Sequence, residues 1–228
     1  MPNAFFVEVS GDTVRLDDIE ANHLRVMRAK KGDRFTGTDG NGGIYKFVLE
    51  EVQKHEATGT VIEKEFVERD GRTIIIAVAA TKWPRLRILL EKATELGVDR
   101  IELFQSRRSV ALLDGEKLSR YTAVVREAAK QSVNPYLPAV ELQRNLDLSG
   151  AHNLLLDFQG KPLRELSKEL GARRKIRMIV GPEGGFTEEE ISGISAASTK
   201  VSLGRRTLRV ETAVIVALGL LNDYTERI

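Results

Sequence analysis

Residues 178–190 constrain the fold most, because an apolar strand runs there into a glycine-rich turn and then directly into a helix. The stretch reads MIVGPEGGFTEEE. Its Gly-Pro and Gly-Gly pairs permit backbone conformations that are closed to other residues. Thr187 and Glu190 have the spacing of a capping box, which begins a helix. Backbone N–H groups are therefore expected to point outward beside the carboxyl end of a strand, where open α/β sheets bind ligands.

A second glycine turn, SLGRRTLRVET, occupies residues 202–212 and is followed by an apolar helix over residues 213–224. We name residues 181–186 the first glycine loop and residues 203–209 the second glycine loop. Either one alone is most often only a tight connection, because glycine supplies positive φ wherever a chain turns sharply. Neither matches GxxxxGK[ST] or GxGxxG, so phosphate cradling of those two kinds is not predicted.

Together, GPEGGFTEEE and LGRRTLRVETA resemble the signature of the RsmE family of ribosomal RNA methyltransferases, which belong to the knotted SPOUT superfamily. The resemblance covers nearly the whole chain through HLRVMR at 23–28, KGD at 31–33, DGNG at 39–42, EKATELGV at 91–98, SRRS at 106–109 and EAAKQS at 127–132. The chain departs at Asn3, where the family commonly has arginine, and at Val133 and Asn134, where it usually has Gly-Arg. Both departures remove a positive charge that could contact RNA, and the glycine loops are unaffected.

Hydrophobic patterning predicts two domains. Residues 1–70 contain short alternating runs between Gly, Asp and Asn turns, at 5–9, 34–38, 44–49 and 58–62, which is typical of a small β-barrel; a helix at 19–28 interrupts it. Residues 73–79 form a continuous apolar strand, after which Pro84 begins a helix that Gly97 ends. Strands at 100–104, 140–143, 153–158, 176–180 and 201–203 then alternate with helices at 116–131, 163–170, 187–197 and 213–224. This alternation predicts an α/β fold with a mainly parallel sheet.

The resemblance adds detail to both domains. It implies that residues 1–70 are a PUA-like, RNA-binding β-barrel and that residues 73–228 are a SPOUT methyltransferase domain with a C-terminal trefoil knot. Because chains generally avoid threading their own loops, the knot is an expectation from the resemblance alone.

Composition narrows the function further. The 228 residues include no cysteine, which excludes disulfides, thiolate metal sites and redox motifs, and the three histidines are too far apart to suggest a metal site. No long apolar run suggests export or a membrane span, so we expect a cytoplasmic protein. Residues 1–70 carry 10 Lys/Arg against 14 Asp/Glu, whereas residues 71–228 carry 25 against 19. The larger part is therefore positively charged, and we expect an RNA phosphate backbone to bind there.

The resemblance implies that S-adenosylmethionine lies between the two glycine loops, with backbone groups contacting its adenine edge. It assigns to this site Gly181, Glu183 and Gly185 of the first loop and Leu203, Gly204, Leu208 and Arg209 of the second. Glycine matters here because the ligand must approach the main chain closely. The strand at residues 154–157 supplies a third wall through Leu156, or is an ordinary core strand.

The lack of cysteine also bears on the acceptor atom. Methylation of C5 of a pyrimidine usually requires cysteine to attack C6, whereas transfer to a ring nitrogen or a ribose oxygen needs only proton loss, alignment and charge stabilisation. The family's product, N3-methyluridine in 16S ribosomal RNA, lies in the permitted set. Loss of the N3 proton spreads negative charge over two carbonyl oxygens, which an arginine can stabilise with two hydrogen bonds.

Arg209 is the first candidate for this stabiliser and Arg205 or Arg206 the second, although phosphate binding or solvation explains the latter two slightly better. Glu183 or Glu211 could accept the proton, or could cap a helix. Candidate contacts to RNA phosphates are positively charged, namely Arg25, Arg28, Lys82, Arg108, Arg205 and Arg206.

The superfamily implies a homodimer with its active site at the subunit interface, and the 16S ribosomal RNA of the assembled small subunit as substrate. Residues 213–221 are apolar almost all round, which indicates a helix covered on more than one side, within a monomer or in a dimer. Two other functions stay open: a SPOUT ribose 2′-O-methyltransferase acting on ribosomal or transfer RNA, and an RNA-binding assembly factor without catalysis. Intact glycine loops argue against the last.

Overall fold

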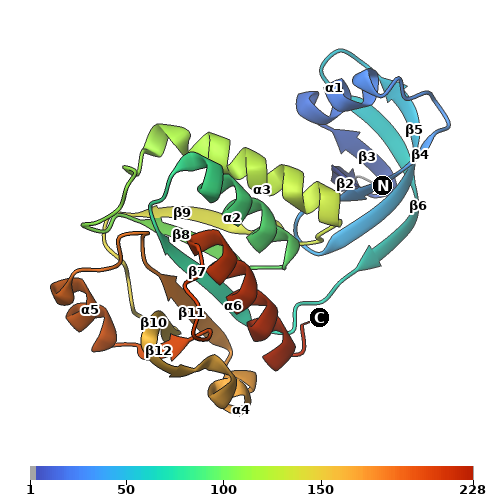
Figure 1. The fold of residues 1–228 in the computed structure, drawn as a ribbon. Coiled ribbons are helices and arrows are strands. Elements are labelled where there is room, and N and C mark those ends of the chain that lie inside the picture. Colours follow the sequence, from blue (N-terminus) through green and yellow to red (C-terminus); the bar gives the residue numbers. More distant parts are fainter. Residues whose placement is uncertain (1–3, 228) are drawn as a thin grey trace. The chain divides into compact units, whose positions relative to one another are not determined.

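The computed structural model describes residues 4–227, and the chain divides into two compact units (Figure 1). The first unit contains the chain up to residue 69 together with residues 126–137. The second contains residues 70–125 and the chain from residue 138 onward. Asn3 lies outside the described residues.

The first unit is a six-stranded sheet with one helix. Its elements are β1 (Ala4–Phe6), β2 (Glu8–Ser10), β3 (Thr13–Leu16), α1 (Asp18–Val26), β4 (Arg34–Thr38), β5 (Gly43–Val52) and β6 (Ala57–Phe66). The strand order is β1-β4-β5-β6-β3-β2. Because β1 and β2 are consecutive segments joined by Val7, the two edges of the sheet are one continuous stretch of chain, which closes the sheet into a barrel. The predicted N-terminal β domain is confirmed.

A buried ion pair explains why residues 126–137 belong to this unit. Nζ of Lys130 lies 2.9 Å from Oε2 of Glu20, and the two side chains are 2% and 0% exposed. Arg126 contacts the other carboxylate oxygen of Glu20 at 3.2 Å. Breaking such a pair by removing one partner typically costs about 3–5 kcal/mol, because a charge is left buried without compensation. The segment is therefore held firmly to α1.

The second unit is built on a six-stranded parallel sheet. Its strands are β7 (Thr73–Ala79), β8 (Arg100–Phe104), β9 (Ala139–Gln143), β10 (His152–Pro162), β11 (Lys175–Val180) and β12 (Thr199–Ser202). They lie in the order β12-β10-β11-β7-β8-β9, and every neighbouring pair is parallel. The predicted α/β fold with a mainly parallel sheet is confirmed.

Helices cover both faces of this sheet. They are α2 (Trp83–Glu95), α3 (Leu118–Ser132), α4 (Ser167–Gly171), α5 (Glu188–Ser195) and α6 (Val210–Tyr224), with 3₁₀ turns at Gly115–Lys117 and Leu163–Leu166. Ile74, Ile76 and Val78 of β7 pack in one core with residues of α2, α3, α4 and α6. The alternate residues Ala77 and Ala79 pack in a second core with α5. This alternation follows from the two-residue period of a strand.

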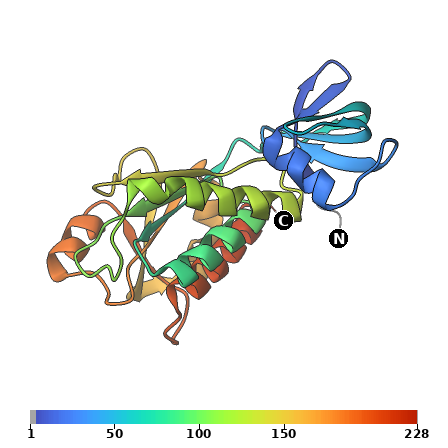
Figure 2. The same ribbon diagram turned by 90° about the horizontal axis from the view of Figure 1, so that it is seen from above.

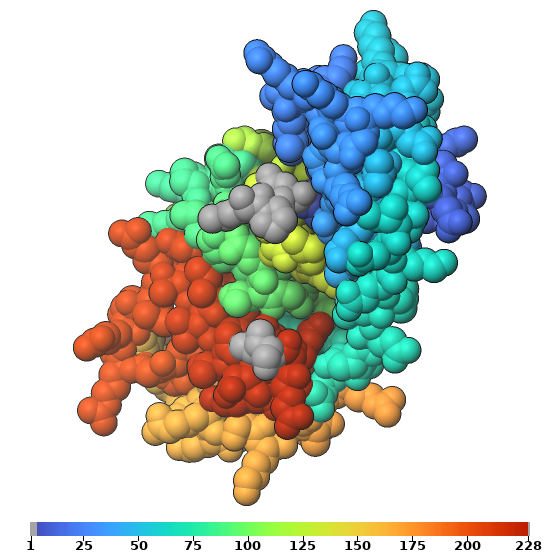
Figure 3. All heavy atoms as spheres, turned by 90° about the vertical axis from the view of Figure 1, so that its right-hand side faces the viewer, coloured from blue at the N-terminus to red at the C-terminus, as the bar shows by residue number. Residues whose placement is uncertain are grey.

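Figure 2 shows α2 and α6 side by side on the first face, where they are in contact. Helix α6 also contacts α4, and the red and orange residues of these segments are neighbours on the surface in Figure 3. No helix within residues 4–227 is long and apolar enough to cross a membrane.

Several elements differ from the sequence prediction; the strand predicted at 5–9, for example, is divided into β1 and β2. Strand β3 was not predicted, because its four residues contain only two apolar positions, Val14 and Leu16. Helix α6 begins at Val210 rather than at Ala213. Its N-cap residue is Arg209, whose side chain makes no capping hydrogen bond, so the sequence carries none of the usual Ser, Thr, Asp or Asn signal for that start.

Candidate functional site

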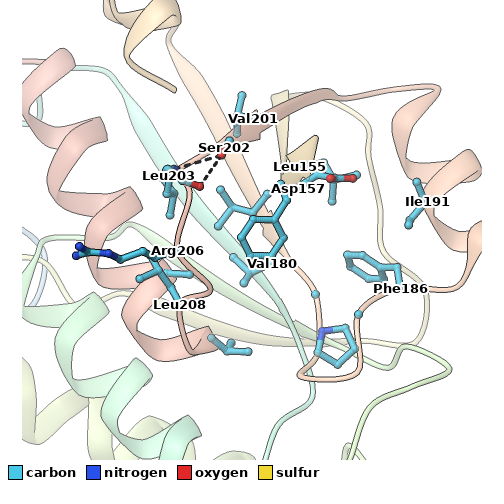
Figure 4. A pocket seen from close by; sticks show the side chains of 18 residues that line it. Leu155, Asp157, Val180, Phe186, Ile191, Val201, Ser202, Leu203, Arg206 and Leu208 are labelled. Carbon is cyan, nitrogen blue, oxygen red and sulfur yellow. Dashed lines mark hydrogen bonds between the residues drawn. The ribbon is translucent and has the colours of Figure 1, made fainter. Parts of the chain in front are cut away.

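The two glycine loops line one cavity of about 310 Å³ beside the middle of β10 and the carboxyl ends of β11 and β12 (Figure 4). Phe186 and Ile191 form one side, and Leu203 and Leu208 approach from the other. Six of the eight residues predicted to bind a cofactor line this cavity: Leu156, Gly181, Gly185, Leu203, Gly204 and Leu208. Glu183 and Arg209 do not line it. The site therefore occupies the place where open α/β sheets bind ligands.

The first glycine loop is a tight turn that requires glycine. The N–H of Gly185 donates to the carbonyl oxygen of Pro182 at 2.9 Å, and Gly185 has φ of +69°. A Cβ atom on Gly181 would lie 2.9 Å from the ring of Phe186, so a larger residue would displace this wall of the cavity. The predicted capping box then begins α5, with Thr187 and Glu190 exchanging hydrogen bonds of 2.8 and 3.3 Å.

Residues 106–109 brace the first glycine loop from outside the cavity. The guanidinium group of Arg108 donates to the carbonyl oxygens of Gly184 and Phe186 at 3.3 and 3.4 Å. The backbone N–H of Arg107 donates to Glu190 at 2.9 Å, and its side chain forms an ion pair with Glu189. Arg108 was predicted to contact RNA, and the structure places it on the backbone of the loop that lines the cavity.

The second glycine loop leaves open space in front of its glycine. The hydroxyl oxygen of Ser202 accepts a hydrogen bond from the N–H of Gly204 at 3.2 Å and donates to its carbonyl oxygen at 3.1 Å. Gly204 has φ of +131°, and a Cβ atom there would meet nothing within 4 Å. The cavity at this point is therefore wide enough for a ligand to reach the main chain.

Glu183 is part of the first glycine loop but does not line the cavity, and its carboxylate is held in place. Oε1 accepts hydrogen bonds from the hydroxyl of Thr81 and from the guanidinium group of Arg85, each at 2.6 Å. Partial burial raises the pKa of Glu183, but the hydrogen bonds from Thr81, the Glu183 backbone N–H and Arg85 outweigh it. The pKa of Glu183 consequently lies below its ordinary value, and the group is ionised at neutral pH.

The other candidate catalytic residues lie along the second glycine loop and the start of α6. Arg206 lines the cavity, and its side chain extends away from the wall formed by Phe186 (Figure 4). Arg209 is exposed, and its chain neighbours Leu208 and Val210 both line the cavity. Arg205 is exposed as well. Glu211 is only 7% exposed and does not line the cavity, and its Oε2 has no hydrogen-bond partner within the described chain.

Several residues of the cavity were given no role of their own in the sequence analysis, and Asp157, at the end of the predicted third wall, is the most informative of them. This carboxylate follows Leu156 and forms an ion pair with Lys200 at 3.3 Å. It is an acidic group in a wall that is otherwise largely apolar, and it is suited to accept hydrogen bonds from the hydroxyl or amino groups of a ligand. Its place directly after the apolar run of residues 154–156 was a signal that could have been used.

The remaining residues predicted to contact RNA are on the surface. Arg25 is exposed and donates to Oδ1 of Asn22 at 3.2 Å. Arg28 is exposed with φ of 57°, just after α1. Lys82 is exposed at the N-cap of α2. Across residues 4–227, no three His, Asp or Glu side chains are placed to hold a metal ion together.

Comparison with known proteins identifies the family. Residues 68–222 match the family model of an RNA methyltransferase domain, and residues 16–62 match that of an RNA methyltransferase PUA domain. The ribosomal RNA small subunit methyltransferase E of Synechocystis is 31% identical over 94% of this chain and 74% of its own length. The chain belongs to the ribosomal RNA small subunit methyltransferase E family. This confirms the family expected from the two glycine loops, and with it a methyltransferase.

Solved structures of similar proteins agree with the methyltransferase E assignment. A ribosomal RNA small subunit methyltransferase E from Neisseria gonorrhoeae, solved bound to S-adenosyl methionine, has a TM-score of 0.87 and 26% identity, with 98% of each chain covered. A predicted RNA methyltransferase from Thermotoga maritima has a TM-score of 0.82 and 34% identity, with 100% of each chain covered. The similarity therefore extends over both units.

Proposed function

We propose that this chain transfers a methyl group from S-adenosylmethionine to N3 of a uridine in the 16S ribosomal RNA of the small ribosomal subunit. The observation that carries this proposal is the convergence of both glycine loops on one cavity in a member of the methyltransferase E family. The relative from Neisseria gonorrhoeae, bound to S-adenosyl methionine, supports the choice of cofactor.

The residues of the cavity fit this cofactor. Gly204 leaves room for close approach to the main chain, and apolar side chains such as Leu203 and Leu208 suit an adenine ring. Asp157 offers an acceptor for ribose hydroxyl or amino hydrogens. S-adenosylmethionine supplies an electrophilic methyl group on a sulfonium centre. Gly181, Gly185 and Leu156 complete the proposed cofactor site, and Glu183 supports it by holding the first glycine loop.

For the acceptor, the chain must remove the N3 proton of uridine and stabilise the charge that results. We assign this stabilisation to Arg209, which is exposed between two residues of the cavity wall and has no ion-pair partner within residues 4–227. Arg206, which lines the cavity, is the alternative. Of the candidate proton acceptors, Glu183 is weakened as a base by its low pKa. Glu211 keeps one carboxylate oxygen without a partner in the described chain.

The wider arrangement is also part of the proposal. Residues 1–70 act as a PUA-like barrel that contacts RNA phosphates through Arg25 and Arg28, and residues 73–228 form the SPOUT domain, with a trefoil knot near its C-terminus. Lys82 and Arg205 add phosphate contacts. The protein acts in the cytoplasm as a homodimer, on the assembled small subunit. Helix α6 supports the dimer, because apolar residues including Ile215, Val216 and Leu220 remain half-buried on it.

An in vitro reaction tests the proposal. Purified protein would be incubated with S-adenosylmethionine and small subunits from cells that lack it, and the RNA would be digested to nucleosides for mass spectrometry. We expect N3-methyluridine to appear. A methylated ribose would instead indicate the 2′-O-methyltransferase, and no methylated nucleoside would indicate an assembly factor without catalysis.

A further inference from the structure

A second cavity, of about 220 Å³, lies at the carboxyl ends of β7 and β8. Trp83 at the start of α2 and Tyr121 of α3 form an aromatic wall, with ring centroids 5.8 Å apart and ring planes inclined by 21°. Leu112 also lines the cavity and is 80% exposed, which places it at the mouth. The result is a largely apolar recess that is open to solvent at Leu112.

Positive charge accompanies this apolar surface. Lys117 and Arg120 both line the cavity and are exposed. The charge of Lys117 is partly neutralised by Asp114, whose Oδ2 lies 3.0 Å from Nζ of Lys117. The guanidinium carbon of Arg120 lies 3.6 Å from the centroid of the Trp83 ring, and Arg120 has no ion pair within residues 4–227. Arg120 is therefore a cation on an aromatic face, with no carboxylate to compete for it.

The second cavity is connected to the first glycine loop through two contacts. Thr81 lines the cavity, and its hydroxyl donates to Glu183, which belongs to that loop. Residues 106–109, which brace the loop through Arg108, lead directly into residues 111–113 of the cavity wall. The wall of the second cavity is therefore joined to the loop that lines the first cavity.

We propose that the second cavity binds an unpaired RNA base next to the methylated nucleotide. The inference rests on the proposed function, because it assumes that RNA is the substrate. A nucleobase has a flat apolar face that stacks on aromatic rings, and every base has one, so such a site needs no particular sequence. The adjoining phosphate is matched by Arg120, which can exchange its contact with the Trp83 ring for a charge-assisted hydrogen bond to phosphate.

The tryptophan provides a direct measurement, because Trp83 is the only tryptophan of the chain. The full-length protein would be titrated with a single-stranded decauridine, and binding would be followed independently by anisotropy of a labelled oligomer. We expect the Trp83 fluorescence to be quenched in proportion to occupancy. An oligomer of the same length with abasic sugars should bind more weakly, through its phosphates alone, and should quench the fluorescence less at equal occupancy.

The affinity of variants for decauridine tests the second cavity. Replacing Trp83 with Ala should weaken decauridine binding about tenfold or more, the usual effect of losing one stacked base. If that variant fails to fold, Leu112→Asp and Arg120→Glu change exposed side chains and should weaken binding while leaving the fold intact. Lys168→Glu is the matched control, since Lys168 is exposed on α4 and lines neither cavity.

The outcomes separate this inference from the proposed function. The protein could methylate ribosomal RNA normally while decauridine leaves the Trp83 fluorescence unchanged and the variants bind decauridine as the natural protein does. That result would overturn the base-binding cavity and keep the proposed function. Quenching by decauridine without any methyl transfer would keep the cavity and overturn the function. Failure of decauridine to bind at all would contradict the inference, because stacking on any base does not require an assembled ribosomal subunit.

Discussion

The hydroxyl group of Thr81 donates a hydrogen bond of 2.6 Å to Oε1 of Glu183, which joins the end of β7 to the first glycine loop. Arg85 donates to the same oxygen at 2.6 Å. Because Glu183 does not line the cavity, these bonds identify it as a residue that positions the loop. A carboxylate that is already held by two donors is a weak proton acceptor, which limits its direct part in the chemistry.

The lowered pKa of Glu183 predicts how stability depends on pH. A carboxyl group whose pKa is lower in the folded state contributes stability above its unfolded pKa, near its ordinary value of 4.5, and loses it as pH falls through the folded pKa. Replacing Glu183 with Gln should therefore lower the free energy of unfolding by about 1–2 kcal/mol at pH 7. The variant and the natural protein should converge in acid.

Urea unfolding followed by the fluorescence of Trp83 measures this difference within the second unit. Glu165→Gln is a suitable control, because Glu165 is exposed and has no ion pair in the described chain. If Glu183→Gln lowers the free energy of unfolding by the same amount at pH 7 and at pH 3, the lowered pKa of Glu183 is contradicted.

Gly204 should control cofactor binding. Replacing it with Val puts a branched side chain into the open space of the cavity, at a backbone φ of +131° that suits glycine. We expect affinity for S-adenosylmethionine, or for its demethylated product, to fall roughly tenfold or more, which corresponds to about 1.4 kcal/mol. Calorimetry measures the affinity. Gly150→Val is the matched control, since Gly150 also has positive φ and open surroundings but lies outside the cavity. Equal effects of both variants would indicate backbone strain alone.

Arg209 should stabilise the transition state of methyl transfer. Lysine in its place keeps the charge but loses the paired hydrogen-bond donors, so the single-turnover rate should fall by about a hundredfold while RNA affinity changes less. The rate of the natural protein should rise with pH until the acceptor is deprotonated. The comparison variant is Arg206→Lys, which should slow the reaction less. If Arg206→Lys is the slower enzyme and Arg209→Lys is near normal, the stabiliser is Arg206.

If the protein forms a dimer through α6, its mass in solution should depend on the half-buried apolar residues of that helix. Light scattering at micromolar concentration should give twice the chain mass of 25.4 kDa. Replacing Val216 with Glu puts a charge on the proposed interface and should produce a monomer, because a buried charge without a partner is costly. Asp223→Lys changes an exposed residue of the same helix and should leave the dimer intact. A monomer mass for the natural protein would rule out this interface.

Long apolar runs made the parallel sheet predictable, and the strands at 73–79 and 100–104 have the predicted bounds. Local patterns also predicted the capping box at Thr187. They could not predict that Lys130 pairs with Glu20, 110 residues away, which assigns the second half of α3 to the first unit. Only the folded chain brings such residues together.

In the functional site, too, local patterns were predictable and contacts between distant residues were not. Both glycine loops were visible in the sequence, because in each an apolar strand and a glycine turn lead directly into a helix, and the first also carries a capping box. The contact of Thr81 with Glu183 spans 102 residues and leaves no local pattern. Asp157 was predicted only as part of the third wall, because a single acidic residue in a strand resembles many surface positions. The role of Arg108 was hidden for a different reason, since a positive charge alone does not distinguish a phosphate contact from a bond to backbone carbonyl oxygens.

The most direct test of the central claim is mass spectrometry of nucleosides from small-subunit ribosomal RNA, taken from cells with and without this protein. We predict that N3-methyluridine is present in the first sample, is lost from the second and returns when the protein is restored. N3-methyluridine at equal levels in both samples, or the loss of a ribose-methylated nucleoside in its place, would contradict the proposed reaction.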